Sequence, residues 1–319
     1  MGTSWYPKHQ HVSSWPEGAR VDVVAEMADL ALRIVADSLF TASSDPALMQ
    51  AVHDFAHSIN EYLLSFGLHP SWLPSGLNRR RRSSIARIDE LGYELIRRRR
   101  NGSDGADLLN MLVSTELSDV EIRDELMTLF FAGHETSATA LAWAFYELSL
   151  QPSIADAVVA ELTDVLGDRD PAMADLARLP YLSSVVKETL RRWPPGWLFD
   201  RTPVAPITIG GYPFRPGQIL YFSPYVIHLD PSNWDSPLEF RPERFAPGVE
   251  IPREIYLPFG DGPRMCIGNR FAEAEVALVL AVVLRRVRLS RVSDEPVVAE
   301  GQATIRPKGG LLMTVSHRL

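Results

Sequence analysis

A single long helical pattern over residues 118–150 constrains the fold of this chain more than any other feature. Ser118 and Glu121 stand three residues apart at its start, which is the spacing of a capping box, where each side chain bonds to the other residue's backbone N–H. Apolar residues then recur at helical spacing to Leu150, and Gln151-Pro152 ends the pattern. At a rise of ~1.5 Å per residue, such a helix is about 45 Å long and crosses a whole domain. The sequence therefore predicts a fold organised around one long helix.

The segments on either side of this helix differ in character. Residues 21–100 carry apolar side chains at helical spacing, interrupted by a predicted turn at 43–46. Further helices are predicted over residues 154–166, 181–193 and 269–286. Beyond Pro195 glycine and proline become dense, and Gly210-Gly211 is predicted to turn a hairpin. Short strands are predicted at 207–209, 219–222 and 311–315. We expect a mainly α fold with small β-sheets (α+β) in a single domain spanning residues 1–319.

The net charge and the cysteine content exclude several classes of protein. The formal charge of −8 argues against a dedicated nucleic-acid binder. With one cysteine in 319 residues, the chain can form neither an internal disulfide nor a thiolate zinc cluster, and a reducing, cytoplasmic setting is expected. No apolar stretch approaches the ~20 residues that span a bilayer, so we expect no membrane segment in this chain. Two arginine runs, 79–82 and 97–100, are predicted to face solvent at helix ends.

The one cysteine, Cys266, lies in a loop whose composition favours an anionic sulfur. Residues 259–268 contain three glycines and a proline and stand just before the predicted helix 269–286, so free backbone N–H groups and the helix N-terminus can stabilise a thiolate. A lone cysteine is more often an inert core residue, and a cysteine protease needs a histidine partner and a nucleophile context that this segment lacks. The histidines are interpreted as surface or core residues, because nothing near them completes a metal site. These histidines are His53, His57, His134 and His228.

The residues around Cys266 resemble a known family of haem proteins. The pattern Phe-x-x-Gly-x-Arg-x-Cys-x-Gly, which starts here at Phe259, is that of the haem-ligand loop of the cytochrome P-450 family, and the chain matches every fixed position. The resemblance implies that the Cys266 thiolate binds the iron of haem b (iron protoporphyrin IX). It assigns Arg264 and Arg201 to the haem propionates. Further cofactor contacts are implied for Phe259, Gly260, Gly268 and Ala132.

A second pair of motifs resembles the structural scaffold of the same family. Glu188 and Arg191 are spaced i, i+3 on the helix predicted over 181–193, as in the family's Glu-x-x-Arg helix. Arg244 lies in a segment, Phe-Arg-Pro-Glu-Arg-Phe, that resembles the loop following that helix. The resemblance implies a buried, charge-assisted network of these three residues with a structural role.

Residues 132–136 of the long helix, Ala-Gly-His-Glu-Thr, resemble the family's oxygen-activation motif. The resemblance implies that Glu135 and Thr136 are the catalytic residues that deliver protons. Thr136 can bond back to a carbonyl one turn earlier. A glycine inside a helix costs up to ~1 kcal/mol relative to alanine, so Gly133 indicates either a closely packed ligand or tight helix packing.

By this resemblance the protein is a haem-thiolate monooxygenase, an oxidoreductase that activates dioxygen to hydroxylate or epoxidise an apolar small molecule. Electrons are expected from a separate ferredoxin, flavodoxin or reductase, because the chain contains no flavin or iron–sulfur segment. The pocket is expected to be apolar, and its lining to include Leu129, Phe130 and Ala132, with Trp197 or Leu198 after the Pro-Pro turn.

Two alternatives stay open from the sequence. Family members normally carry a further segment before the matched region, so the chain is interpreted as lacking the usual N-terminal strands and first helices. A truncated, catalytically silent homologue that acts as a binding or interaction module is therefore one alternative. The other is a haem enzyme that uses peroxide, or rearranges its substrate, without an electron partner.

Overall fold

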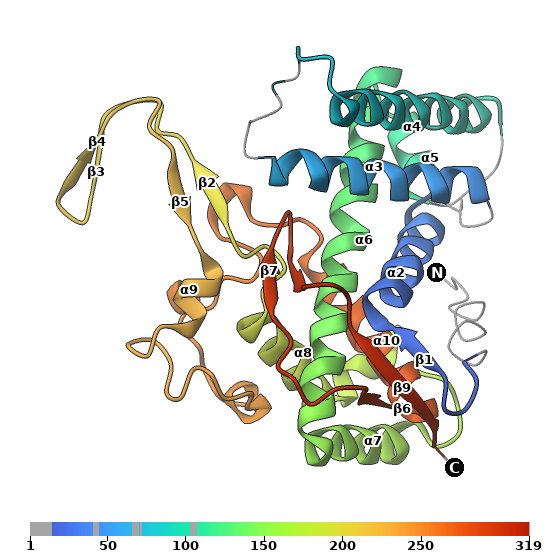
Figure 1. Ribbon diagram of the computed structural model, residues 1–319, viewed down its shortest axis with the longest axis vertical. Coiled ribbons are helices and arrows are strands. Elements are labelled where there is room, and N and C mark those ends of the chain that lie inside the picture. Colours follow the sequence, from blue (N-terminus) through green and yellow to red (C-terminus); the bar gives the residue numbers. More distant parts are fainter. Residues whose placement is uncertain (1–14, 41–44, 66–69, 71, 103–106, 319) are drawn as a thin grey trace. The chain divides into compact units, whose positions relative to one another are not determined.

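The computed structural model describes residues 15–40, 45–65, 70, 72–102 and 107–318. The chain divides into a first unit within residues 1–142 and 286–319 and a second unit of residues 143–285. Both units are mainly helical, and their sheets are small and antiparallel (Figure 1). The predicted fold class is confirmed, whereas the single domain stays a prediction. No helix of the described residues is long and apolar enough to cross a membrane.

The first unit holds a three-stranded antiparallel sheet of order β1-β9-β6 (Figure 1). Its strands are β1 (Arg20–Asp22), β6 (Val287–Arg291) and β9 (Leu312–His317). Asp22 holds the corner after β1, because its Oδ1 accepts hydrogen bonds from the N–H groups of Val24 (3.1 Å) and Leu311 (2.9 Å). The helical prediction is wrong for residues 21 and 22, because these residues bond to β9 at the other end of the chain.

The helices of the first unit surround the start of the long helix. They are α2 (Val23–Phe40), α3 (Pro46–Leu64), α4 (Gly76–Arg100), α5 (Leu108–Val113) and the first part of α6 (Asp119–Leu150). Helices α3 and α4 pack side by side (Figure 1). Asp45 caps α3 by accepting from the N–H groups of Ala47 and Leu48, whereas residues 43 and 44 of the predicted turn lie outside the described residues. A short hairpin of β7 (Ala299–Gly301) and β8 (Ile305–Pro307) completes the unit.

Both arginine runs lie on α4, one at each end of the helix. The second run forms the last turn, where cations complement the helix dipole, whereas the first run lies at the N-terminus, where the dipole does not favour them. Most of these side chains face solvent, as predicted. The prediction is wrong for Arg99, which is buried in a bidentate pair with Asp107 at 2.7 Å. Asp107 also caps α5, so this pair joins the ends of two helices.

Helix α6 begins and ends where the sequence predicts. The Ser118 N–H donates to Glu121 Oε2 (2.8 Å) and the Glu121 N–H donates to Ser118 Oγ (3.3 Å), which confirms the capping box. Residues 137–148 are buried without interruption, so this stretch of α6 has no solvent-facing side. The helix continues from the first unit into the second and stops before Pro152.

The second unit carries the remaining helices and two small hairpin-like sheets. Its helices are α7 (Pro152–Leu166), η2 (Met173–Arg178), α8 (Pro180–Arg192), α9 (Pro224–Leu229), η3 (Pro242–Phe245), η4 (Arg253–Ile255), η5 (Gly262–Arg264) and α10 (Asn269–Arg286). Strand β2 (Phe199–Arg201) pairs with β5 (Leu220–Phe222), and β3 (Ile207–Ile209) pairs with β4 (Tyr212–Phe214). Gly210 and Gly211 turn the second hairpin with φ of 57° and 85°, as predicted.

The core of the second unit is built where α6 ends against α8. The Trp193 ring stacks on Trp143 with centroids 3.8 Å apart. Its Nε1–H donates to Glu147 at 2.7 Å, so the buried carboxyl group has a partner. Burial raises the pKa of Glu147 in spite of this bond.

Candidate active site

The cysteine loop of the second unit is held by its own backbone. The Cys266 N–H donates to the Phe259 carbonyl (3.0 Å), the Gly260 N–H donates to the Leu257 carbonyl (3.1 Å), and the Met265 N–H donates to the Gly262 carbonyl (3.0 Å). Gly260 and Gly262 have φ of 70° and 72°, a region that other residues enter only with strain. The loop therefore depends on glycine at these two positions.

The loop presents the thiol of Cys266 to the outside. Cys266 is exposed, and its neighbours Met265 (41% exposed) and Ile267 (95% exposed) are also uncovered. Gly268 follows, where a Cβ would lie 3.9 Å from the sulfur, and its carbonyl accepts the first hydrogen bond of the α10 region from the Ala272 N–H. The sulfur thus stands just before the N-terminus of α10, where a negative charge is stabilised.

Two arginines of the second unit are available for an anionic ligand. Arg264 and Arg201 are both exposed, and neither forms an ion pair with a residue that the structure describes. Arg201 donates to the Asp200 carbonyl (2.7 Å), and its guanidinium carbon lies 5.0 Å from the Phe199 ring centroid. Both side chains are therefore free to meet a carboxylate.

The residues of the predicted charge network lie together at the C-terminal end of α8. Arg191 Nε and Nη2 donate to the two oxygens of Glu188 at 2.7 and 2.8 Å, and both side chains are fully buried. The Arg244 Nε lies 3.4 Å from Glu188 Oε1, and the backbone N–H of Arg241 donates to the same oxygen at 2.8 Å. Burial lowers the pKa of Arg244. The carboxylate is thus bonded at both oxygens inside the protein.

A histidine that the sequence leaves without a role connects this network to the cysteine loop. His228 Nδ1 bonds to the Arg191 carbonyl at 2.9 Å, and the Leu257 N–H donates to His228 Nε2 at 2.8 Å. Leu257 stands two residues before Phe259, whose carbonyl holds Cys266. No local pattern around His228 signals this contact, because its partners come from distant parts of the chain.

The oxygen-motif residues of α6 belong to the first unit. The Thr136 hydroxyl donates to the Ala132 carbonyl at 2.8 Å, so the expected bond to the preceding turn is present. Ala132 is exposed and Thr136 half-buried, four residues apart on one side of the helix. A Cβ on Gly133 would lie 3.0 Å from Val35 Cγ2 of α2. Tight helix packing therefore explains this glycine.

Glu135 is held by two residues that the sequence does not single out. Its Oε1 accepts from Asn60 Nδ2 of α3 at 3.0 Å and from the Thr304 hydroxyl, between β7 and β8, at 3.3 Å. Neither residue belongs to a motif, because the contacts join segments far apart in the chain. The neighbouring His134 is buried, and this burial lowers its pKa.

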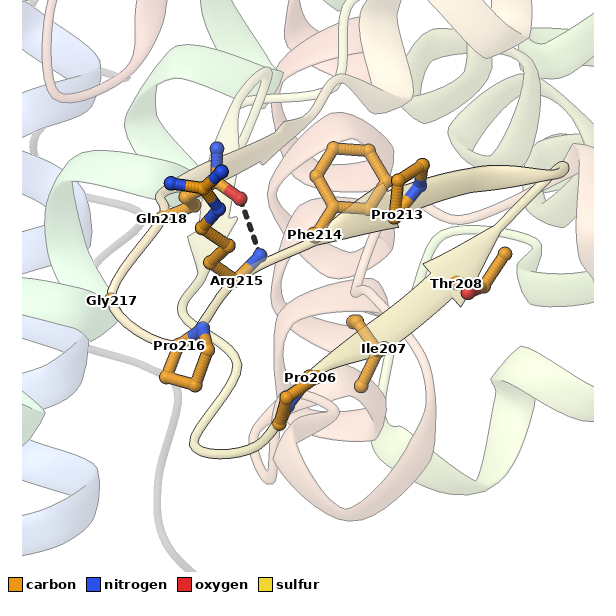
Figure 2. A pocket seen from close by; sticks show the side chains of 9 residues that line it. All are labelled: Pro206, Ile207, Thr208, Pro213, Phe214, Arg215, Pro216, Gly217 and Gln218. Carbon is orange, nitrogen blue, oxygen red and sulfur yellow. Dashed lines mark hydrogen bonds between the residues drawn. The ribbon is translucent and has the colours of Figure 1, made fainter.

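A pocket of about 790 Å³ lies beside the β3–β4 hairpin, lined by residues 206–208 and 213–218 (Figure 2). At this pocket the backbone N–H of Arg215 donates to Gln218 Oε1 at 2.5 Å (Figure 2). Arg215 is the only titratable residue of its lining, so the pocket offers no carboxylate or imidazole for acid–base chemistry. Among the described residues, no cluster of three or more His, Cys, Asp or Glu side chains could hold a metal ion.

Comparisons with known proteins agree with these observations. The cytochrome P-450 family profile matches residues 8–314. Cyclooctatin synthase of Streptomyces melanosporofaciens is 36% identical over 292 residues, and cyclooctat-9-en-7-ol 5-monooxygenase of the same organism is 33% identical over 292 residues. Each alignment covers 87% of this chain, and the chain spans 64% of the length of each relative.

A solved structure shows the same fold. The crystal structure of the cytochrome P-450DA haem domain superposes with a TM-score of 0.87 and 29% sequence identity, and covers 98% of this chain and 72% of that one. Sequence motifs, fold and family profile point the same way: the chain belongs to the cytochrome P-450 family.

Proposed function

We propose that this protein is a haem-thiolate monooxygenase in which Cys266 binds the iron of haem b. The observation that carries the proposal is the exposed thiol of the only cysteine, set on a backbone-fixed loop before the N-terminus of α10. A thiolate in this position is stabilised by the helix terminus and is free to bind a metal from outside. The family membership of the chain supports the same cofactor.

The residues beside the thiol, together with two exposed arginines of the second unit, fit a large, flat, mostly apolar group with acidic side chains. Ile267 and Met265 offer uncovered apolar surface, which such a ring would remove from water. Arg264 and Arg201, which lack carboxylate partners among the described residues, would bind the propionates in charge-assisted hydrogen bonds. Further contacts are proposed for Phe259, Gly260 and Gly268 of the same loop.

The proposed chemistry divides between the cofactor and the side chains. When bound, haem supplies the reductive activation of dioxygen that allows one oxygen atom to enter an apolar substrate. The Cys266 thiolate holds the iron. Glu135 and Thr136 hold and move protons, and the Thr136 hydroxyl donates to the Ala132 carbonyl one turn earlier, the kind of bond that can bend a helix and admit water. Glu188, Arg191 and Arg244 keep the scaffold around α8 in place.

The substrate is proposed to be an apolar small molecule, and the electron donor a separate ferredoxin, flavodoxin or reductase. One relative is named as a monooxygenase of cyclooctat-9-en-7-ol, which supports oxidation of an organic substrate by this chain. Five of the nine arginines of α4 pair with carboxylates, so this helix is not proposed as an anion-binding surface.

The test is the carbon monoxide difference spectrum of the dithionite-reduced protein, expressed with haem supplied, beside a Cys266→Ala variant. We expect a red-shifted Soret band in the parent protein and its loss in the variant. Because the chain has one cysteine, a thiol reagent also reports on this residue alone, and bound haem should protect it from reaction.

A folded parent protein without this band would refute the monooxygenase proposal and favour a catalytically silent homologue. If the band is present, product analysis with NAD(P)H and a reductase, compared with peroxide alone, separates the proposed reaction from one that needs no electron partner.

A further inference from the structure

The Glu135 carboxylate is held asymmetrically. Both donors, Asn60 Nδ2 at 3.0 Å and Thr304 Oγ1 at 3.3 Å, bond to Oε1. The second oxygen, Oε2, is buried and has no hydrogen-bond partner among the residues that the structure describes. Glu188, whose role is structural, differs because its two oxygens accept from Arg191. A carboxylate that served packing alone would be expected to have both oxygens satisfied.

The orientation of the Asn60 side chain is fixed by two contacts of opposite kind. Its Nδ2 donates to Glu135, and its Oδ1 accepts from the Ala303 N–H at 3.4 Å. A flipped amide would place an acceptor against the carboxylate and a donor against an N–H group. Asn60 is buried, so water does not compete for these bonds.

Thr304 is fixed in the same way by a chain of hydroxyl groups. Its hydroxyl lies 3.2 Å from the Thr139 hydroxyl and 3.3 Å from Glu135 Oε1. Since a hydroxyl has one hydrogen and Glu135 needs a donor, Thr304 donates to Glu135 and Thr139 donates to Thr304. Both threonines are buried, and the Gln302 N–H donates to the Thr304 carbonyl at 2.9 Å, which holds the turn.

We propose that Asn60 and Thr304 are positioning residues that clamp Oε1 of Glu135 and so reserve Oε2 as the oxygen that takes up and releases protons. This inference rests on the proposed monooxygenase function. The clamp joins α3, α6 and the β7–β8 turn, and all three belong to the first unit. Charge-assisted hydrogen bonds to one oxygen fix the carboxylate rotamer, while the other oxygen keeps its lone pairs for transfer.

The contact itself is tested by a swap of donor and acceptor. Asn60→Asp keeps the acceptor for the Ala303 N–H but replaces the amide donor with an acceptor facing Glu135. We expect a lower urea midpoint for this variant, and recovery when it is combined with Glu135→Gln, which returns one donor and one acceptor to the pair. Asn110→Asp, at an exposed position of α5, is the matched control and should leave the midpoint unchanged. Additive effects of Asn60→Asp and Glu135→Gln would refute the clamp.

The positioning role is tested on the haem-loaded protein by NADPH consumption with a ferredoxin and its reductase, measured in H₂O and in D₂O. Thr304→Val and Asn60→Asp should lower the rate about tenfold, as expected for one lost charge-assisted hydrogen bond, and should raise the solvent isotope effect. Thr304→Ser, which keeps the hydroxyl, should retain the parental values. The swapped pair should regain stability without regaining rate, because its carboxylate stands at position 60 and no longer at position 135.

The outcomes separate the two proposals. A parent protein without the carbon monoxide band refutes the monooxygenase function and, with it, the proton-delivery role. A parent with the band, whose Thr304→Val and Thr304→Ser variants show the same rate and isotope effect, leaves the function intact and refutes the clamp as a positioning device.

Discussion

Arg191 uses every N–H of its guanidinium group inside the protein. Two donate to Glu188, and the others donate to the carbonyls of His228 (2.8 Å), Pro237 (3.0 Å) and Glu239 (3.1 Å). Such a group is stable when buried only because each donor has a partner. One side chain thereby fixes the path of the loop that follows α9.

Removal of one member of the buried Glu188–Arg191 ion pair should lower the stability of the protein strongly. We expect Glu188→Ala to lower the free energy of unfolding by about 3–5 kcal/mol, because it leaves the Arg191 charge buried and unpaired. The matched control is Glu94→Ala, which breaks the exposed pair with Arg98 and should cost less than about 1 kcal/mol. Urea unfolding of both variants is the measurement, and equal losses would contradict a special role for the buried pair.

His228 should make stability depend on pH. Burial, chiefly, lowers the pKa of His228 to about 4, and its Nε2 must stay unprotonated to accept from the Leu257 N–H. In the unfolded chain the histidine pKa is about 6.5, so the unfolded state binds the proton first as the pH falls. The contribution of His228 to the free energy of unfolding is therefore fully present above pH 6.5 and is lost as the pH falls towards 4.

The expected size of this effect is about 3 kcal/mol between pH 7 and pH 4. The measurement is the unfolding free energy of the parent and of His228→Asn across that range. The difference between the two curves gives the contribution of His228, because the variant lacks this titrating group. His57→Asn, at an exposed position, is the matched control. Parallel curves for the parent and His228→Asn would show that this histidine does not titrate as described.

At the scale of elements, helix α6 contains a glycine, Gly133, which lowers its helix propensity but allows close packing against α2. Gly133 lets α2 approach so closely that an added Cβ would meet the branched, fully buried Val35 at 3.0 Å. Gly92 of α4 differs, because its added Cβ would meet the flexible end of Met127 at 3.2 Å. Both glycines lie inside helices, so substitution by alanine should raise the helix propensity of the chain by a similar amount at each position.

These two positions should respond to alanine in opposite directions. Gly133→Ala is expected to destabilise the protein by about 1 kcal/mol, since an overpacking cost of about 1–3 kcal/mol exceeds the propensity gain. Gly92→Ala is expected to stabilise it by about 0.5–1 kcal/mol, because the Met127 methyl can move aside. Thermal or urea unfolding decides. A stabilising Gly133→Ala would mean that α2 yields to the added methyl group.

At the scale of the whole molecule, the second unit is one continuous segment inserted between the two segments of the first. The cysteine loop and the Glu188 network lie in the second unit, whereas Glu135, Thr136 and the clamp lie in the first. A ligand that binds the folded protein and not the unfolded chain stabilises it by mass action.

Haem should therefore stabilise the parent protein and do so through Cys266. At a free haem concentration of 100 times Kd, the expected gain is about 2.7 kcal/mol, seen as a higher unfolding midpoint. Cys266→Ala should lose most of this gain and keep the midpoint of the haem-free parent, because its side chain is exposed. An equal gain in parent and variant would place the bound haem elsewhere.

The sequence by itself determined the features that depend on neighbouring residues. The capping box and proline stop bound α6, the glycine pair turns the β3–β4 hairpin, and the apolar run over 269–286 forms α10. The motif residues around Cys266 and Glu188 follow from the resemblance of short segments to family motifs. Local hydrogen bonds and fixed dihedral angles decide such features, so a short window of sequence contains them.

Tertiary structure alone decided the features whose partners are distant in the chain. Strand β1 exists because β9 supplies its hydrogen bonds, and Arg99 is buried because Asp107 meets it from the next helix. The contacts of His228 with Leu257, and of Asn60 and Thr304 with Glu135, have no local signature. Their stability comes from excluding water around groups that only the folded chain brings together, and no window of sequence carries that information.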